Sequence, residues 1–235
     1  EFNGVFWHSD FQLPNSYHYN KYKKCKDLGI RLIQIFEDEW NEKTDIVKGT
    51  LSYLLGMVTD KAYARKCEVI KVSKQEKAQF LNNNHIYGNG NSTIDLGLRI
   101  NLELVSVISF MKKSSNIYEL NRYATSKNVV GGFSKLMKFF EKAYNPAKII
   151  TYADLRWSEG SLYLNNGFIN DGFIKPDYTW VKRDKRYHKF NFRHKMMKTR
   201  LSNYDSSISE SQNMRNHGYY KIYDAGKLRF VKNFN

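Results

Sequence analysis

The residues best placed for chemistry are two adjacent glycines, Gly131 and Gly132, which stand just before a helical pattern. A glycine turn at a helix start leaves backbone N–H groups unpaired at the positive end of the helix dipole, which suits a pyrophosphate or another anion. An ordinary tight turn explains the pattern equally well. Arg122, nearby in sequence, could reach an anionic donor or a DNA phosphate, or could be solvated at a strand end. The pattern therefore indicates a candidate anion site.

Residues 181–200, VKRDKRYHKFNFRHKMMKTR, form a basic run in which lysine and arginine alternate with Tyr187, Phe190 and Phe192. A strand or arm of this composition could neutralise phosphates while its rings stack on bases or sugars. A solvated basic face is the alternative, but Asp184 is the only counter-charge in the run. The predicted contacts to double-stranded DNA are Lys182, Arg183, Lys185, Arg186, Lys189, Arg193 and Lys195.

The whole chain is strongly basic, with a formal net charge of +15. This charge favours a polyanionic partner, and nucleic acid fits better than an anionic membrane because no basic helix with a clear apolar face stands out. No apolar run approaches the roughly 20 residues that a membrane span requires. Cys25 and Cys67 match no metal-binding spacing and suggest no disulfide framework. A reduced, cytoplasmic setting is therefore expected.

Sequence patterns also predict the elements that position the glycine turn. Apolar residues at helical spacing over 133–143 predict a helix with one apolar face, which ends before Pro146. A short strand is expected over 148–152, followed by a helix over 158–165 with Ser158 as its N-cap. The turn would thus lie between a sheet and the first of two helices.

Upstream of the turn, the chain predicts a strand over 67–72 and a helix that begins at Ser73, where Glu76 completes a capping box. His85 at the end of this helix could face a ligand, but capping of carbonyl groups is the preferred interpretation. The remaining strands are expected over 92–100, 104–111, 117–125 and 172–181. The predicted order is strand, helix, three strands, helix, strand, helix, strand.

This order, together with the "LYLNNGF" sequence around Tyr163, resembles the core of the GNAT acyltransferase family. The resemblance implies that the glycine turn holds the pyrophosphate of an acyl-CoA donor and that Tyr163 protonates the leaving thiolate. The segment "YADLRWSEGSLY" more narrowly resembles the phage Mu DNA-modification family, a GNAT branch that acts on adenine in DNA. That resemblance implies a catalytic role for Asp154, which would orient or deprotonate the amine.

The N-terminal segments "VFWH" and "YHYNKYKKCKDLGIRLIQIFEDEW" resemble very-short-patch repair endonucleases and homing endonucleases of the EDxHD type. The resemblance implies phosphodiester hydrolysis with Mg²⁺ held by carboxylates, and it assigns this work to Glu1, as metal ligand, and to His8 and His18. It also places a further metal-binding aspartate upstream of Glu1. The given sequence has no strand before Glu1 that could supply this aspartate. We therefore expect this chain to bind DNA without cutting it.

Together these patterns predict an α/β (α+β) chain in three parts. Residues 1–60 would form a partial endonuclease-like α/β unit, 61–183 a GNAT-like mixed sheet with flanking helices, and 184–235 a basic tail. A β-hairpin turning at Asp224-Ala225-Gly226 would end the chain. The predicted function is a DNA-base-modifying transferase of phage type acting inside a bacterial host cell. The alternative is a homing-type endonuclease in which the GNAT-like part recognises DNA.

Overall fold

The computed structural model describes residues 1–234, apart from the side chains of His194 and Lys195, so the predicted DNA contact of Lys195 lies outside the described residues. The chain divides into two compact units that interleave along the sequence. Unit 1 comprises Glu1–Glu42, Asp154–Glu159 and Phe173–Lys227, and unit 2 comprises the rest. Each of the three parts predicted from the sequence is one continuous stretch, whereas each observed unit combines segments that are distant in sequence.

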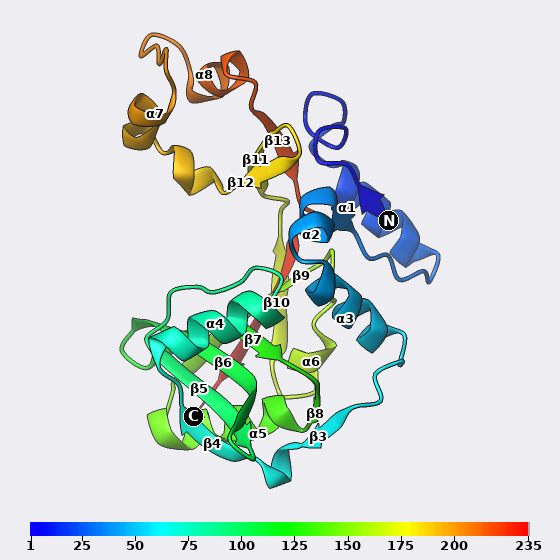
Figure 1. Cartoon of the computed structure of the whole chain (residues 1–235), viewed down its shortest axis with the longest axis vertical. Coiled ribbons are helices and arrows are strands. Elements are labelled where there is room, and N and C mark those ends of the chain that lie inside the picture. The colour runs from blue at the N-terminus through cyan, green and yellow to red at the C-terminus, as the bar shows by residue number, and fades with distance from the viewer. Residues whose placement is uncertain (235) are drawn as a thin grey trace. The chain divides into compact units, whose positions relative to one another are not determined.

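Unit 2 is built on a mixed seven-stranded sheet with the order β10-β14-β9-β7-β6-β5-β4 (Figure 1). Strands β4 to β7 pair antiparallel with their neighbours, whereas β7 and β9 pair parallel. The predicted order of strands and helices in this unit is confirmed, but the closing strand expected over 172–181 was wrong, because β10 ends at Ile174 and Tyr178 begins a strand of another sheet. The strands are β4 (Glu68–Lys71), β5 (Ile94–Ile100), β6 (Glu103–Ser114), β7 (Ile117–Thr125), β9 (Lys148–Asp154), β10 (Ile169–Ile174) and β14 (Lys227–Asn233).

Helices cover both faces of this sheet. Helix α4 packs Phe80 and Leu81 against Val107 and other residues on one face, and Figure 1 shows it lying across the strands. Helix α5 buries its predicted apolar side, including Phe140, in the larger core on the other face. The capping box of Ser73 at the start of α4 is confirmed. The helices of unit 2 are α3 (Thr44–Leu54), α4 (Lys74–Asn84), α5 (Gly132–Tyr144), α6 (Ser161–Leu164) and the 3₁₀ turn η1 (Ala64–Lys66).

Unit 1 contains two small sheets and several short helices. A parallel pair, β1 and β2, flanks helix α1 in the predicted strand–helix–strand order, and the sheet β12-β11-β13 carries an aromatic core around Trp180. The elements are β1 (Phe2–Asn3), α1 (Tyr17–Asp27), β2 (Ile35–Phe36), α2 (Glu37–Glu42), β11 (Tyr178–Lys182), β12 (Lys185–Tyr187), η2 (Lys189–Phe192), α7 (His194–Arg200), α8 (Glu210–Asn216) and β13 (Tyr220–Tyr223).

The predicted C-terminal β-hairpin was wrong. Its two strands enter different sheets, because β13 pairs with β11 and β14 lies between β9 and β10. The Asp224 side chain accepts the N–H groups of Asp177 and Gly226, so the turn is tied to another segment rather than to a facing strand. The N-cap of α6 is also not Ser158 but Gly160, whose φ of 82° is left-handed.

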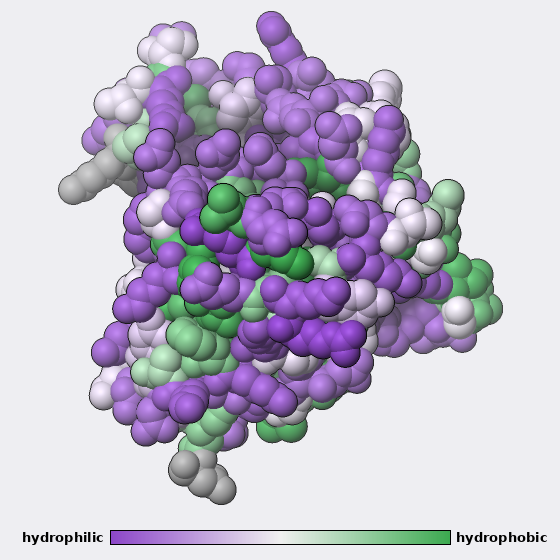
Figure 2. Space-filling model, turned by 60° about the horizontal axis from the view of Figure 1, so that its bottom comes forward, coloured by the Kyte–Doolittle hydropathy of each residue, from purple (hydrophilic) through white to green (hydrophobic). Residues whose placement is uncertain are grey.

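Hydrophilic side chains predominate on the face shown in Figure 2, where apolar side chains form small separate patches. Among residues 1–234, no helix is long and apolar enough to cross a membrane.

The stacked pair Phe110–Phe140, with ring centroids 3.6 Å apart, ties α5 to the sheet. Phe140 is fully buried, whereas its neighbour Phe139 is 39% exposed. Phe140→Ala should therefore lower the free energy of unfolding by about 3–5 kcal/mol, while Phe139→Ala should cost less than about 1 kcal/mol. Urea denaturation of both variants measures the difference, and equal losses would contradict this packing.

Candidate functional site

The parallel strands β7 and β9 separate toward their carboxyl ends. They pair only from Ile117↔Lys148 to Glu119↔Ile150, although β7 continues to Thr125. Open α/β sheets bind ligands beyond the carboxyl ends of their strands, where neighbouring strands diverge. The opening lies beside the start of α5, which is the element after β7 and the short strand β8 (Asn128–Val130).

Helix α5 begins at the predicted glycine turn. Gly131 is its N-cap in a left-handed conformation, with φ of 75°. The first intrahelical bond runs from the Lys135 N–H to the Gly131 carbonyl, and the Phe133 N–H interacts with the Tyr123 hydroxyl. Within residues 1–234, the N–H groups of Gly132 and Ser134 have no acceptor. The turn therefore presents two backbone donors at the positive end of a helix.

The two glycines have different roles. A β-carbon at Gly131 would meet only the Ala64 methyl at 3.8 Å, so there is space for a side chain at this position. Glycine is favoured here because φ is positive, a conformation that other residues rarely adopt. A β-carbon at Gly132 would lie 3.0 Å from both the Tyr123 hydroxyl and a Val129 methyl. Gly132 is thus required by close packing beneath the turn, and Gly131 by the shape of the turn itself.

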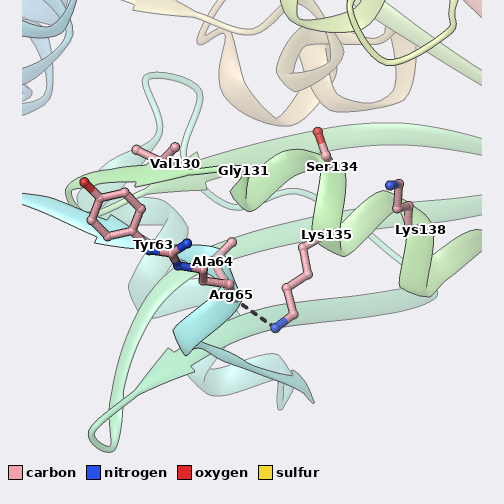
Figure 3. Close-up of a pocket in the computed structure, with 8 residues that line it drawn as sticks. All are labelled: Tyr63, Ala64, Arg65, Val130, Gly131, Ser134, Lys135 and Lys138. Atoms are coloured by element: carbon pink, nitrogen blue, oxygen red, sulfur yellow. Dashed lines mark hydrogen bonds between the residues drawn. The ribbon is translucent and has the colours of Figure 1, made fainter.

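A pocket of about 530 Å³ opens in front of this turn. One wall is α5, and the other is formed by η1 and β3 (Lys61–Tyr63), which pairs parallel with β8. Figure 3 shows the Lys135 side chain reaching from α5 toward Ala64, where its ammonium donates to the carbonyls of Ala64 and Cys67. The lining residues are Tyr63, Ala64, Arg65, Val130, Gly131, Ser134, Lys135 and Lys138.

The charge of this pocket is wholly positive. Because Lys135 is bound to wall carbonyls, the cations left for a ligand are Arg65, which lies 5.4 Å from the Tyr63 ring, and Lys138. No carboxylate is among the lining residues that the structure describes. The pocket therefore suits a phosphate or pyrophosphate group held by backbone N–H groups and side-chain cations.

Tyr163 lies beside the strand opening, in an aromatic cluster with Phe133, Phe168 and Phe230. Burial raises the pKa of Tyr163, and the nearby Thr151 side chain partly offsets this effect. Thr151 Oγ1 itself donates to the Leu120 carbonyl at 2.9 Å. Thr151 therefore connects β9 to β7 where their backbone pairing ends, beside Tyr163.

Asp154, the second predicted catalytic residue, belongs to unit 1, whereas Tyr163 belongs to unit 2. The Asp154 carboxylate accepts from Nη2 of buried Arg156 at 3.1 Å. Arg156 also binds Glu39 at 3.0 Å, and Arg186 binds the same carboxylate at 2.8 Å. Burial alone would raise the pKa of Glu39, but the two guanidinium groups hold it below its usual range. Asp154 is therefore one member of a buried ionic network.

Arg122 does not line the pocket. Its Nε donates to the Gly88 carbonyl at 3.0 Å and its Nη1 to the Asn121 carbonyl at 2.7 Å, and burial lowers its pKa. At the end of α4, His85 accepts the N–H of Tyr87 on its own ring nitrogen rather than capping carbonyls with it. Both residues hold the loop that follows α4.

Unit 1 brings together two of the residues assigned by the endonuclease resemblance. His8 Nδ1 lies 3.2 Å from His18 Nε2, and burial lowers the pKa of both imidazoles, that of His18 to about 4. Glu1 Oε1 forms an ion pair with Lys21 at 2.5 Å. Throughout the described part of the chain, no group of three or more His, Cys, Asp or Glu side chains could hold a metal ion. These residues therefore do not fit a Mg²⁺ site.

The basic run folds into β12, η2 and α7 rather than an arm. Phe192 is buried in the core of unit 1, so the expectation that it stacks on bases was wrong, whereas Tyr187 packs half-buried against this core and Phe190 is 54% exposed. Arg186 is held by Asp38 and Glu39 inside the unit. The other cations have exposed or half-buried side chains, namely Lys182, Arg183, Lys185, Lys189 and Arg193, of which Lys185 pairs with Glu42 and Lys189 with Asp177.

Sequence reasoning found the glycine turn but missed the pocket wall. Arg65 comes from a segment far upstream of Gly131, and only the β3–β8 pairing places the two together. Ser134 and Lys138 could have been found, because they follow Gly131 at positions that face outward from a helix with a known apolar side.

No protein-family model matches the chain, and no curated protein matches its sequence. Solved structures that resemble it include an acetyltransferase from Bacillus subtilis in complex with CoA, at 16% identity over 72% of this chain and 100% of that chain, with a TM-score of 0.42. An IAA acetyltransferase from Bacillus cereus has 8% identity over 72% and 99%, with a TM-score of 0.40. The ribosomal-protein-S18-alanine N-acetyltransferase from Escherichia coli has 8% identity over 71% and 93%, with a TM-score of 0.41. At these scores the similarity assigns no activity to this chain.

The buried His18 should make stability depend on pH. Its folded pKa of about 4 lies below the value of 6.5 for an ordinary histidine. Between these values the unfolded chain binds a proton that the folded chain does not, so stability is full above pH 6.5 and falls as the pH drops toward 4. His18 contributes up to about 3 kcal/mol to this loss.

Urea unfolding at pH 7 and at pH 4.5 checks this expectation. His18→Gln should lose less stability than the wild type between the two pH values, because glutamine binds no proton. An identical loss in both proteins would contradict the enclosure of His18.

Proposed function

We propose that unit 2 binds an acyl-CoA-type donor at the Gly131 pocket and that the chain transfers the acyl group to an amine of a DNA base. One observation carries the proposal: a positively charged pocket of about 530 Å³, lined by Gly131 and Ser134, lies at the start of α5, where two backbone N–H groups are unpaired and the neighbouring parallel strand pair separates. The sequence resemblance to GNAT acyltransferases supports this class of donor.

In this proposal the N–H groups of Gly132 and Ser134 hold the donor's pyrophosphate, and the side chains of Arg65 and Lys138 neutralise its charge. Backbone donors fixed by a helix need no reorganisation when an anion arrives, so they bind it with little entropic cost. Lys135 keeps the opposite wall in place through its bonds to Ala64 and Cys67. In this proposal four residues would bind the pyrophosphate, whereas Lys135 holds the pocket wall in position.

Tyr163 is the proposed general acid. Acyl transfer forms a bond between the acceptor nitrogen and the acyl carbon and breaks the carbon–sulfur bond, and the departing thiolate needs a proton. A tyrosine hydroxyl is protonated at neutral pH, and burial raises the pKa of Tyr163 further. Thr151, which donates to the Leu120 carbonyl, lies near that hydroxyl at the strand opening. Asp154 stays the proposed group for orienting or deprotonating the acceptor amine.

The proposed acceptor, a base in double-stranded DNA, would have to leave the stack to be modified. Unit 1 supports DNA as the partner through exposed cations that are not committed to its core, in particular Arg183 and Arg193, and through the exposed ring of Phe190. The guanidinium of Arg193 lies 4.0 Å from that ring. Phosphate contacts from such cations would hold the duplex.

The alternative, a homing-type endonuclease, has less support. Its predicted residues His8 and His18 lie together, but Glu1 is paired with Lys21 and forms no metal-binding group with them. We propose instead that unit 1 holds DNA for the reaction in which unit 2 supplies the donor.

The general acid can be tested by Tyr163→Phe, which keeps the ring in its cluster and removes the hydroxyl proton. The rate of base modification should fall by about 10²–10⁴-fold. The assay incubates the protein with acetyl-CoA and duplex DNA and analyses the nucleosides by mass spectrometry. Tyr152→Phe, on the same strand as Thr151 but 39% exposed, is the matched control and should be unchanged.

Equal rates for the wild type and Tyr163→Phe would contradict the role of Tyr163. Absence of any modified nucleoside in the wild-type reaction would contradict the proposed transfer from acetyl-CoA to DNA. Unfolding of Tyr163→Phe is not expected, since a lost hydroxyl costs only about 1 kcal/mol.

A further inference from the structure

The side chain of Asn166 ties the first turn of α5 to the end of α6. Its Oδ1 accepts a hydrogen bond from the Ser134 hydroxyl at 2.7 Å. Its Nδ2 donates to the Leu162 carbonyl at 2.8 Å, and its backbone N–H donates to the Tyr163 carbonyl at 2.9 Å. Asn166 therefore contacts one residue of α5, which lines the pocket, and two successive residues of α6.

Chemistry fixes the direction of these hydrogen bonds. A carbonyl oxygen can only accept, so the Asn166 atom that faces the Leu162 carbonyl must be the amide nitrogen. The amide oxygen then faces Ser134, whose hydroxyl donates its one hydrogen to it. The Ser134 side chain is thus engaged by Asn166, whereas its backbone N–H is one of the two unpaired donors at the start of α5.

A ring contact joins the same two helices. Phe133, which precedes Ser134 in α5, is 3% exposed, and its ring centroid lies 5.9 Å from that of Tyr163. The Tyr163 carbonyl also accepts the N–H of Phe168 at 3.1 Å, across a turn in which φ of Gly167 is 81°. The backbone on both sides of the Tyr163 ring is therefore held by bonds that depend on the residues after α6.

The preceding residue, Asn165, provides a comparison within the same turn. Asn165 is exposed, whereas Asn166 is half-buried. Among the described residues, the Asn165 side chain has no hydrogen-bond partner. The two asparagines have the same chemistry, so the bonds of Asn166 result from its position between the helices.

We propose that Asn166 is a positioning residue that couples the donor pocket to Tyr163. The inference rests on the proposed function, in which the Ser134 N–H binds the donor and Tyr163 protonates the departing thiolate. A pyrophosphate held at the start of α5 fixes Ser134, and the bond from Ser134 to Asn166 passes this constraint to the end of α6. Displacement of a catalytic group by about 1 Å can cost about 10²-fold in rate, so one such bond affects catalysis.

The coupling is tested by titrating CoA into the ¹⁵N-labelled wild type, Asn166→Ala and Asn165→Ala, with NMR of the backbone amides. In the wild type and in the control Asn165→Ala, the signals of Ser134 and Tyr163 should shift along one saturation curve. In Asn166→Ala the Ser134 signal should still shift, because its N–H is retained, but the shift at Tyr163 should be clearly smaller. Ser134→Ala breaks the same bond from the other end, keeps the bond from Asn166 to Leu162, and should show the same loss at Tyr163.

Kinetics of acetyl transfer from acetyl-CoA to duplex DNA give a second readout. Asn166→Ala should lower kcat by roughly 10- to 100-fold with little change in KM for acetyl-CoA, because the backbone donors remain and only the position of Tyr163 changes. A residue that served stability alone would leave kcat per folded molecule unchanged. Asn165→Ala should match the wild type in both constants. The double variant Ser134→Ala/Asn166→Ala should lose no more than Asn166→Ala, since both changes remove the same bond.

The outcomes separate this inference from the proposed function. A Tyr163 shift of equal size in the wild type and Asn166→Ala, or a fixed Tyr163 signal in a wild type whose Ser134 signal moves, would overturn the coupling and leave the donor site. Coupled shifts without any modified nucleoside would support the coupling and overturn DNA as the acceptor. Absence of shifts at both residues in the wild type would overturn the donor site and this inference with it.

Discussion

The parting of β7 and β9 is the constraint on which the rest of unit 2 depends. Two parallel strands that pair at three positions and then diverge leave backbone groups that must find other partners. Thr151 supplies one by donating to the Leu120 carbonyl, and the Tyr163 ring lies nearby in its aromatic cluster. Helix α5 begins after β7 and β8, and its Gly131 and Ser134 line the pocket at the end of the helix where the N–H groups of Gly132 and Ser134 are unpaired.

A net charge of +15 does not by itself reveal where a polyanion binds. Much of it is committed inside the fold, since Arg186 completes an ionic network with Glu39, Lys135 holds the pocket wall, and Arg122 and Lys77 hold the loop after α4. Such groups shape the fold, and the exposed cations at the pocket and in unit 1 are the ones left to contact a ligand.

Local patterns predicted local structure well. The apolar side of α5 and the capping box of Ser73 are set by residues three and four apart, and both were confirmed. Patterns of alternating residues identified β13 and β14 as strands but could not show that they enter different sheets, because the choice of a partner strand depends on distant residues. For the same reason sequence patterns indicated Gly131 but not Arg65, and they could not distinguish Arg186, bound inside unit 1, from Arg183 at the surface.

The most direct test of the proposed donor site is a titration of CoA into the ¹⁵N-labelled chain, followed by NMR of the backbone amides. The amide signals of Gly132 and Ser134 should shift and saturate together, because their N–H groups are the proposed pyrophosphate donors. The amide of Gly29, in unit 1 and far from the pocket in sequence, should stay unchanged. Saturable shifts that leave Gly132 and Ser134 unmoved, or no shifts at all, would contradict the site.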